Sequence, residues 1–206
     1  MINLYNGDCM EAMKGMKDNQ YDLAIVDPPY GINGGINDNR KTVNKSKKNS
    51  MRSFGLIEWD KEPPSINYFN ELKRVSKDYI IWGGNYFNLH SYRTYIVWDK
   101  MTYIPTMSQI DLAVTSFNEP SKMVKINSNQ ENRIHINQKP VALYKWLLKN
   151  YAKEGDKILD THGGSMSIAI ACHDMKYDLD LWELDDDYYN AGVKRYNQHI
   201  RQLQLF

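Results

Sequence analysis

Short apolar runs alternate with amphipathic segments along this chain, and the alternation restricts the fold more than any other feature of the sequence. The apolar runs have the length of strands, and several of the segments between them carry apolar residues at helical spacing. Strands that alternate with helices predict an α/β fold with a doubly wound, mostly parallel sheet. Two runs between Thr94 and Phe117 follow each other without a helix, which predicts an antiparallel hairpin at one edge of that sheet.

The expected elements cover most of the chain. We predict strands at residues 2–7, 22–27, 78–84, 94–100, 111–117, 156–162 and 177–185. We predict helices at residues 9–17, 65–76, 140–152, 167–175 and 186–200. The chain has 206 residues, of which 42% are hydrophobic, and it has no internal repeat, so we expect one domain over residues 1–206 with a sizeable core.

Charge and cysteine content exclude several classes of protein. The formal net charge is +1, so any attraction to nucleic acid must be local. Cys9 and Cys172 are the only cysteines and stand far apart, which argues against a disulfide framework and against a zinc site. The sequence shows no leader and no membrane-spanning run, so we expect a cytoplasmic protein that needs neither a metal nor a membrane.

The stretch LAIVDPPYGI, residues 23–32, ends an apolar strand at an acid, two prolines and an aromatic ring. Adjacent prolines cannot continue a helix, and they donate no hydrogen bond to a sheet ladder. Asp27 is therefore expected at the carboxyl end of a strand, the edge where open α/β sheets bind ligands. Its carboxylate and the carbonyl of Pro28 can accept N–H groups of a ligand, while Tyr30 can stack on a ring.

A second stretch, KILDTHGGSMSIAIACHDM at residues 157–175, runs from a strand through an acid and a glycine pair into a helix. Glycines at such a turn let backbone amides approach a ligand, although a plain strand-to-helix turn explains the pattern as often as a nucleotide site does. Glu183 ends the next strand, where a carboxylate can accept both hydroxyls of a ribose, and Leu184 beside it can cover an adenine ring. Together these residues predict a cofactor that contains adenosine.

Six segments, in this order, resemble the motifs of one enzyme family. They are YNGDCMEAMK at 5–14, DPPYGI at 27–32, IIWGGNYF at 80–87, YIVWDK at 95–100, NQKPVALYKWLL at 137–148 and WELDDDYYNAGVKR at 182–195. The family is that of the S-adenosylmethionine-dependent DNA amino-methyltransferases. The resemblance is to its permuted, beta-type group, in which the catalytic motif precedes the cofactor motif, and in particular to phage-borne members. It implies a Rossmann-like methyltransferase fold with circularly permuted motif order, in which strands from both ends of the chain lie side by side.

The resemblance also implies roles for individual residues. The catalytic motif would be Asp27, Pro28, Pro29 and Tyr30. The cofactor would be S-adenosylmethionine, bound by Asp8, Cys9, Asp27, Lys139, Asp160, His162, Gly163, Gly164, Ser165, Glu183 and Leu184. No metal is needed, because the sulfonium of the cofactor supplies the leaving group.

Some of these residues have a second interpretation. Asp8 can cap the helix that follows it, and Lys139 can be an exposed residue ahead of a proline that starts a helix. The cofactor motif reads DTHGGSMS, with Thr161 and His162 in place of the usual proline and phenylalanine and Met166 in place of the last glycine. His162 is more often a packing residue than a ligand, and the lost glycine could narrow the pocket for methionine.

The segment at residues 33–55 is strongly basic and is expected to be a loop that contacts DNA. Its cations are Arg40, Lys41, Lys45, Lys47, Lys48 and Arg52, and it carries no acid between residues 40 and 52. Such a segment beside a ligand site can clamp phosphates, whereas a solvated loop is the alternative. Within the domain we assign residues 1–32 to the catalytic motif region, 101–137 to a segment for sequence recognition, and 138–206 to the cofactor-binding region.

The expected substrate is double-stranded DNA with its target base flipped out of the helix. The aspartate that begins the catalytic motif favours N6 of adenine, since serine is commoner there in enzymes that act on cytosine. N4 of cytosine remains the alternative, as does a non-catalytic nucleic-acid-binding protein that kept the fold. A homodimer and a restriction endonuclease partner are compatible with the resemblance, but no residue of this chain identifies either.

Overall fold

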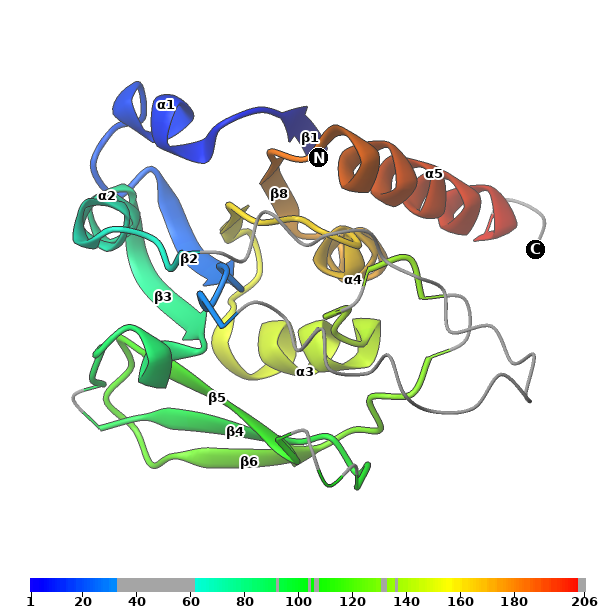
Figure 1. The fold of residues 1–206 in the computed structure, drawn as a ribbon. Coiled ribbons are helices and arrows are strands. Elements are labelled where there is room, and N and C mark those ends of the chain that lie inside the picture. The colour runs from blue at the N-terminus through cyan, green and yellow to red at the C-terminus, as the bar shows by residue number, and fades with distance from the viewer. Residues whose placement is uncertain are drawn as a thin grey trace.

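The computed structural model describes residues 1–32, 62–91, 93–103, 105, 108–130, 133–135 and 137–203. Over these residues the chain forms one eight-stranded sheet in the order β1-β8-β7-β2-β3-β5-β4-β6 (Figure 1). The strands are β1 (Ile2–Asn6), β2 (Tyr21–Val26), β3 (Ser76–Trp82), β4 (Tyr95–Asp99), β5 (Ile110–Thr115), β6 (Lys122–Lys125), β7 (Lys157–Asp160) and β8 (Asp178–Glu183). The predicted doubly wound α/β fold is therefore confirmed.

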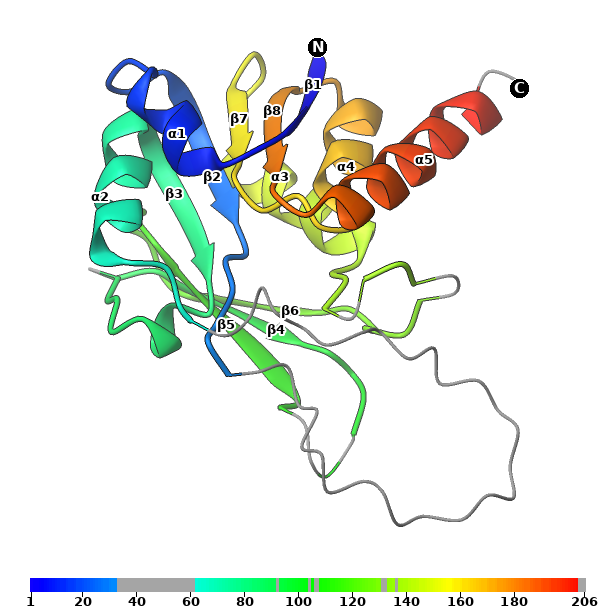
Figure 2. The ribbon, with the colours of Figure 1, turned by 45° about the horizontal axis from the view of Figure 1, so that its top comes forward.

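Helices cover both faces of the sheet. They are α1 (Cys9–Lys14), α2 (Ile66–Val75), α3 (Val141–Tyr151), α4 (Ser167–Met175) and α5 (Asp186–Leu203), with a 3₁₀ turn, η3 (Gly84–Tyr86), after β3. Figure 2 shows α1 and α2 on one side of the sheet and α3, α4 and α5 on the other. The strand β2 explains this division, because Leu23 and Ile25 pack in the core under α3 and α4, while Ala24 and Val26 pack under α1 and α2.

Four adjacent strands come from opposite ends of the chain. The strand β8 pairs in parallel with β1 on one side and with β7 on the other, and β7 pairs in parallel with β2. The carboxyl ends of these strands therefore meet at one edge of the sheet. This is the arrangement expected for strands that end near Asp8, Asp27, Asp160 and Glu183.

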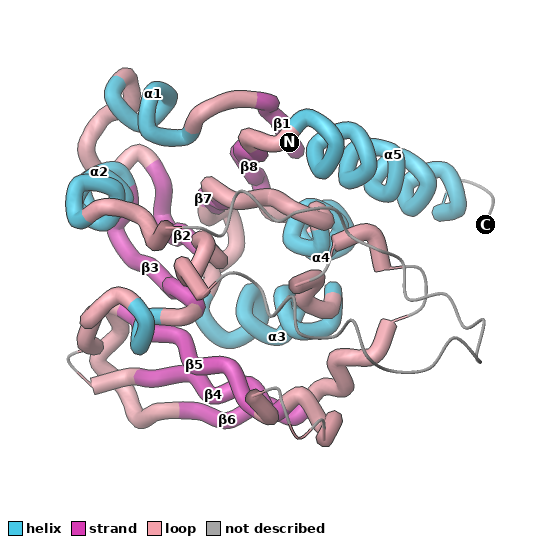
Figure 3. The backbone as a smooth tube through the Cα atoms, viewed as in Figure 1, coloured by secondary structure: helices cyan, strands magenta, loops and turns pink. Residues whose placement is uncertain are grey.

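The antiparallel pair formed by β4 and β5 is also confirmed, but it does not form the edge of the sheet. The short strand β6 pairs in parallel with β4 and takes the outer position (Figure 3, where β4, β5 and β6 lie together). The sequence did not predict β6, because Val124 is the only buried residue of its four and Met123 is 61% exposed. No helix in the described part of the chain is long and apolar enough to cross a membrane.

Asp180 on β8 connects this strand to three others. Its carboxylate accepts hydrogen bonds from Asn3 Nδ2 on β1 at 2.7 Å and from the Tyr21 hydroxyl on β2 at 2.9 Å, and it pairs with Lys157 Nζ on β7 at 2.6 Å. Burial by itself would raise the pKa of Asp180, but these three donors outweigh it and hold the pKa below its ordinary value. The carboxylate is thus a stabilising contact among the four strands that carry the site.

We expect Asp180→Asn to lower the free energy of unfolding at pH 7 by about 1–3 kcal/mol, because the amide removes the charge that the three donors face. The folded-state pKa of Asp180 is depressed, so its contribution exists above about pH 4, the unfolded value, and is lost as the pH falls through the folded value. Urea denaturation at pH 7 and pH 3 tests this, and the difference from wild type should shrink at pH 3. The exposed pair of Glu11 and Lys14 supplies a control, since Glu11→Gln should leave the unfolding midpoint unchanged.

Candidate active site

The turns after β1 and β7 are both attached to the end of β8. The Gly7 N–H donates to the carbonyl of Glu183 at 2.9 Å, and the Gly163 N–H donates to the carbonyl of Trp182 at 2.8 Å. The next strand of the row, β2, leads directly into Asp27. The candidate site is therefore a row of four strand ends, with the catalytic motif on β2 and the glycine turn and Glu183 on β7 and β8.

Both oxygens of the Asp27 carboxylate accept hydrogen bonds from the protein. The Tyr30 hydroxyl donates to Oδ1 at 2.7 Å, and Lys139 Nζ donates to Oδ2 at 2.5 Å. The Asp27 side chain remains 18% exposed, whereas that of Lys139 is 4% exposed. Each carboxylate oxygen has two lone pairs, so Asp27 is a fixed acceptor that can still accept a donor from a ligand.

Tyr30 is held in place by its neighbours. Gly83 has a φ of +71°, and a Cβ there would lie 2.3 Å from the Tyr30 ring, so only glycine fits. The ring of Tyr86 stacks on Tyr30 at 4.8 Å, and Phe87 contacts it edge-on at 5.9 Å. Burial, and then the charge of Asp27, raise the pKa of Tyr30 well above its ordinary value, so the hydroxyl stays a donor.

Asp160, the acid at the end of β7, is 2% exposed within the site. Burial is the main reason that the pKa of Asp160 rises to about 8, with Asp27 and Glu183 adding to the rise and the bond from the His162 amide opposing it. That amide donates to Asp160 Oδ1 at 3.0 Å. The carboxyl group is therefore mostly neutral at pH 7, which lets a third carboxyl group lie near the two at Asp27 and Glu183.

His162 has the features of a packing residue. Its Nδ1 lies 2.9 Å from the Thr161 hydroxyl and 3.5 Å from that of Tyr68, and its ring meets the Tyr68 ring edge-on at 5.3 Å. Burial lowers its pKa to about 4, so the imidazole is neutral at pH 7. These contacts favour the interpretation in which the His162 ring packs in place of the usual phenylalanine ring. A role for His162 in cofactor binding stays a prediction.

The glycine turn is bonded to Glu183. The Gly164 N–H donates to Glu183 Oε2 at 2.6 Å, and the Asp185 N–H donates to Oε1 at 2.9 Å. Gly164 has a φ of +48°, and the nearest side chain to a Cβ there would be His135 at 3.7 Å. Leu184, next to Glu183, is 69% exposed at the rim of the same turn. The strand tip thus combines a carboxylate, backbone amides and an uncovered apolar side chain.

Met166 does not obstruct this turn, although it replaces a glycine of the usual motif. It takes the left-handed conformation (φ +56°) at the N-cap of α4, and its side chain is fully buried. It packs against α5 at Gly192, where a Cβ would come within 2.8 Å of Met166 Cγ. Gly192 on α5 therefore provides the space that the Met166 side chain fills.

Three further predicted residues lie around the turns. Asp8 caps α1, with its Oδ1 accepting from the Met10 N–H at 2.7 Å, so its structural role is observed while its contact with adenine stays a prediction. Burial, and then the charge of Asp8, raise the pKa of Cys9 to about 12, so the thiol is unreactive at pH 7. Ser165 is buried, and its carbonyl accepts from Arg195 of α5 at 2.6 Å.

Lys139 lies in the catalytic half of the site. The alternative of an exposed lysine is wrong, because the residue is 5% exposed and its ammonium contacts Asp27. Three other members of the site were not predicted: Tyr68, which bonds Thr161 at 2.7 Å, Tyr86, and His135, whose ring packs on Tyr188 at 4.3 Å. Only Tyr86 had a signal in the sequence, since it belongs to the IIWGGNYF segment. The six basic residues Arg40, Lys41, Lys45, Lys47, Lys48 and Arg52 lie outside the described residues.

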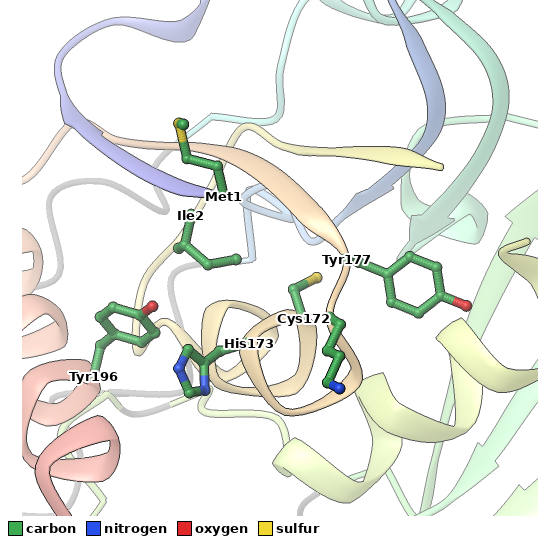
Figure 4. A pocket seen from close by; sticks show the side chains of 7 residues that line it. Met1, Ile2, Cys172, His173, Tyr177 and Tyr196 are labelled. Atoms are coloured by element: carbon green, nitrogen blue, oxygen red, sulfur yellow. The ribbon is translucent and has the colours of Figure 1, made fainter. Parts of the chain in front are cut away.

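Two other features lie away from this site. A hollow beside the amino ends of β1 and β8 is lined by Met1, Ile2, Cys172, His173, Lys176, Tyr177 and Tyr196 (Figure 4). It is at the opposite edge of the sheet from Asp27. In the described part of the chain, the one group with metal-ligand geometry is His173, Asp174 and His199, whose ligand atoms lie within 4.8 Å of one another. Lys145 already pairs with Asp174 at 2.6 Å, so we assign this group to packing among α3, α4 and α5.

Comparisons with known proteins agree on one class. A family model described as DNA methylase matches residues 43–194, a range that begins after Tyr30 and includes the glycine turn and Glu183. The type II methyltransferase M2.MboI of Moraxella bovis is 21% identical over 82% of this chain and 78% of its own length.

Solved structures share the fold. The M1.HpyAVI-SAM complex superposes with a TM-score of 0.63 at 18% identity, over 95% of this chain and 100% of that one. The PvuII DNA methyltransferase, described as cytosine-N4-specific, superposes with a TM-score of 0.63 at 12% identity, over 98% of this chain and 92% of that one.

Proposed function

The chain belongs to the DNA methylase family, and from this premise we propose that it transfers a methyl group from S-adenosylmethionine to the N6 amino group of adenine in DNA. Members of this family methylate N6 of adenine or N4 of cytosine in DNA. Our proposal goes beyond family membership in choosing adenine. One observation carries transfer to an exocyclic amino group: the Asp27 carboxylate is fixed by Tyr30 and Lys139 at the sheet edge that also carries Glu183 and the glycine turn. The choice of adenine rests on the aspartate that begins the catalytic motif.

The residues at the end of β8 fit a ligand that contains adenosine. Glu183 is a carboxylate already oriented by two backbone amides, with lone pairs left to accept ribose hydroxyls. Leu184 supplies an uncovered apolar side chain beside it for a purine ring. When bound, S-adenosylmethionine would supply a methyl group on a sulfonium: the C–S bond would break as the N–C bond forms, a neutral thioether would leave, and the amino nitrogen would release one proton, with no covalent bond to the protein.

Asp27 acts on the other partner of the reaction. An exocyclic amino group is a poor nucleophile because its lone pair is delocalised into the ring. A hydrogen bond to the Asp27 carboxylate and another to the Pro28 carbonyl draw the nitrogen towards tetrahedral geometry and leave the lone pair aimed at the donor methyl. The protein's contribution is mainly positioning, and no catalytic metal is required.

Aromatic side chains at the mouth of the site fit a flipped base. Tyr30 and Tyr86 form a stacked pair, and Tyr86 is 43% exposed. Extruding a base from the duplex costs a few kcal/mol, which stacking on such rings offsets. The exposed Met101, Tyr103 and Ile110 lie between β4 and the start of β5, within residues 101–137, and we propose that they contact DNA. We propose that the basic segment at residues 33–55 binds phosphates.

Incubation with tritiated S-adenosylmethionine and unmethylated duplex DNA, followed by digestion to nucleosides, tests the proposal. We expect the label in N6-methyladenine. Label in N4-methylcytosine would correct the base and keep the reaction, because Asp27 can accept from either amino group. Absence of label, together with calorimetric binding of S-adenosylmethionine, would identify a binding protein that lacks turnover. A single-stranded RNA of the same sequence is the matched control substrate.

A further inference from the structure

Four alternating charges connect the catalytic motif to the β4–β5 pair. Lys100, just after β4, pairs with Oδ1 of Asp111 on β5 at 2.7 Å. Lys139, just before α3, lies 3.8 Å from Oδ2 of Asp111 and 2.5 Å from Oδ2 of Asp27. All four side chains are largely buried, with exposed fractions between 4% and 19%. Lys139 therefore bridges two carboxylates from different strands.

The surroundings of Lys139 are unusual for a lysine. Its ammonium lies 5.2 Å from the centre of the Trp82 ring, 5.9 Å from that of Tyr30, and 3.4 Å from the Tyr30 hydroxyl. Lysine is almost never fully buried unless it is paired, and an apolar side chain of similar size at such a position is often neutral or stabilising. Packing alone therefore gives no reason for a charge here, whereas a carboxylate that must stay ionised and oriented does.

We propose that Lys139 is a positioning residue, which holds the Asp27 carboxylate ionised and aimed at the target amino group while Asp111 holds Lys139. The inference rests on the function proposed above. The bonds from Tyr30 and Lys139 reach different oxygens of Asp27 and so fix the plane of the carboxylate. Asp111 is needed because a lysine side chain is flexible, and its second carboxylate keeps the ammonium from turning away.

Removing the Lys139 ammonium should change the pH dependence of methyl transfer in a predictable direction. Loss of an adjacent cation favours the protonated form of a carboxyl group over the ionised form. Other groups also act on Asp27, and they stay in place in the variants. They are Tyr30, Tyr68, His135, Tyr144, Asp160 and His162. Because Asp27 must be ionised to accept the amino group, the acidic limb of the rate profile should move to higher pH.

The test compares Lys139→Met, Lys139→Arg and Asp111→Asn in single-turnover methylation across pH, with S-adenosylmethionine affinity measured by calorimetry. We expect Lys139→Met to slow methyl transfer at least about 30-fold at pH 7.5 and to move the acidic limb up by about one pH unit. Lys139→Arg should keep the limb near its wild-type position, and Asp111→Asn should give a smaller shift in the same direction. Cofactor affinity should stay within about threefold in all three. Lys77→Met is the matched control, because Lys77 pairs with Asp22 at 2.6 Å but is 57% exposed.

Titration of the Asp27 carboxyl carbon by NMR, without DNA or cofactor, separates this inference from the proposed function. A titration curve that lies at higher pH in Lys139→Met than in wild type would support the inference even if wild type methylated neither base. An unchanged titration in both Lys139→Met and Asp111→Asn overturns it. Lost cofactor affinity with an unmoved acidic limb would also overturn it, and would place Lys139 at the methionine end of the cofactor. If Lys139→Met fails to fold, Asp111→Asn and Lys139→Arg still decide the matter.

Discussion

Asp27→Ala is expected to abolish methyl transfer, with a loss of at least about 1,000-fold in the single-turnover rate. The substitution removes the acceptor proposed to localise the lone pair of the target nitrogen, and it also leaves the buried Lys139 without its closest partner. Binding of S-adenosylmethionine should stay within a few fold of wild type, because Glu183 and the glycine turn lie on other strands. Rapid-quench measurements with tritiated cofactor, paired with calorimetry, give both quantities.

Asp27→Asn sharpens this prediction. The amide keeps the size of the side chain and one acceptor oxygen, yet it presents N–H donors towards Tyr30 or Lys139 and carries no charge. We expect it to be nearly as inactive as Asp27→Ala. Near-normal turnover in Asp27→Ala would show that the acceptor is elsewhere and that the proposed mechanism is wrong.

Glu183→Ala is expected to weaken S-adenosylmethionine binding by about 1.5–3 kcal/mol, the range for hydrogen bonds to a charged group. The side chain is proposed to accept ribose hydroxyls, and it also orients the turn through Gly164. Isothermal titration without DNA measures the change directly. The rate of the bound complex should fall much less than the affinity.

Two variants control the Glu183 experiment. Glu183→Gln keeps an acceptor oxygen for the Gly164 amide, so it separates damage to the turn from loss of the ribose contact. Asp186→Ala removes a nearby carboxylate at the exposed start of α5. This carboxylate accepts a hydrogen bond from Asn6 Nδ2 at 2.6 Å. It should leave affinity unchanged. Unaltered affinity in Glu183→Ala would place the ribose elsewhere and remove the main support for the cofactor site.

The parts of the site that could be predicted from the sequence are those that local chemistry determines. Asp27 had to end a strand because two prolines follow it, and Gly164 had to turn because a helix begins close behind it. The adjacency of the four strand ends followed from the resemblance, which relates segments at both ends of the chain. Each of these inferences needed only a short window of sequence or an ordered set of such windows.

The parts that could not be predicted depend on contacts between distant residues. Lys139 reaches Asp27 across 112 positions, and nothing beside either residue indicates the pairing. Met166 is accommodated by Gly192 on another helix. The motif by itself does not show this contact, so from the sequence the replacement of its last glycine could only be interpreted as a narrowing of the pocket. The strand β6 depends on pairing with β4, since its four residues bury only Val124. Tyr68 and His135 reach the site by the same kind of long-range packing.

The order of strands in the sheet also determines when the protein can fold as it leaves the ribosome. The strands β2, β3, β5, β4 and β6 all lie between residues 21 and 125 and pair with one another, so that half of the sheet can form early in synthesis. Among the described strands, one edge of β2 then has no partner until β7 emerges, and β1, which precedes β2 in the chain, pairs only once β8 is made. Such an uncovered edge favours pairing with other chains. The glycine turn and Glu183 are thus synthesised after Asp27, and in a chain stalled before residue 157 the strand β2, which leads into Asp27, lacks its β7 partner.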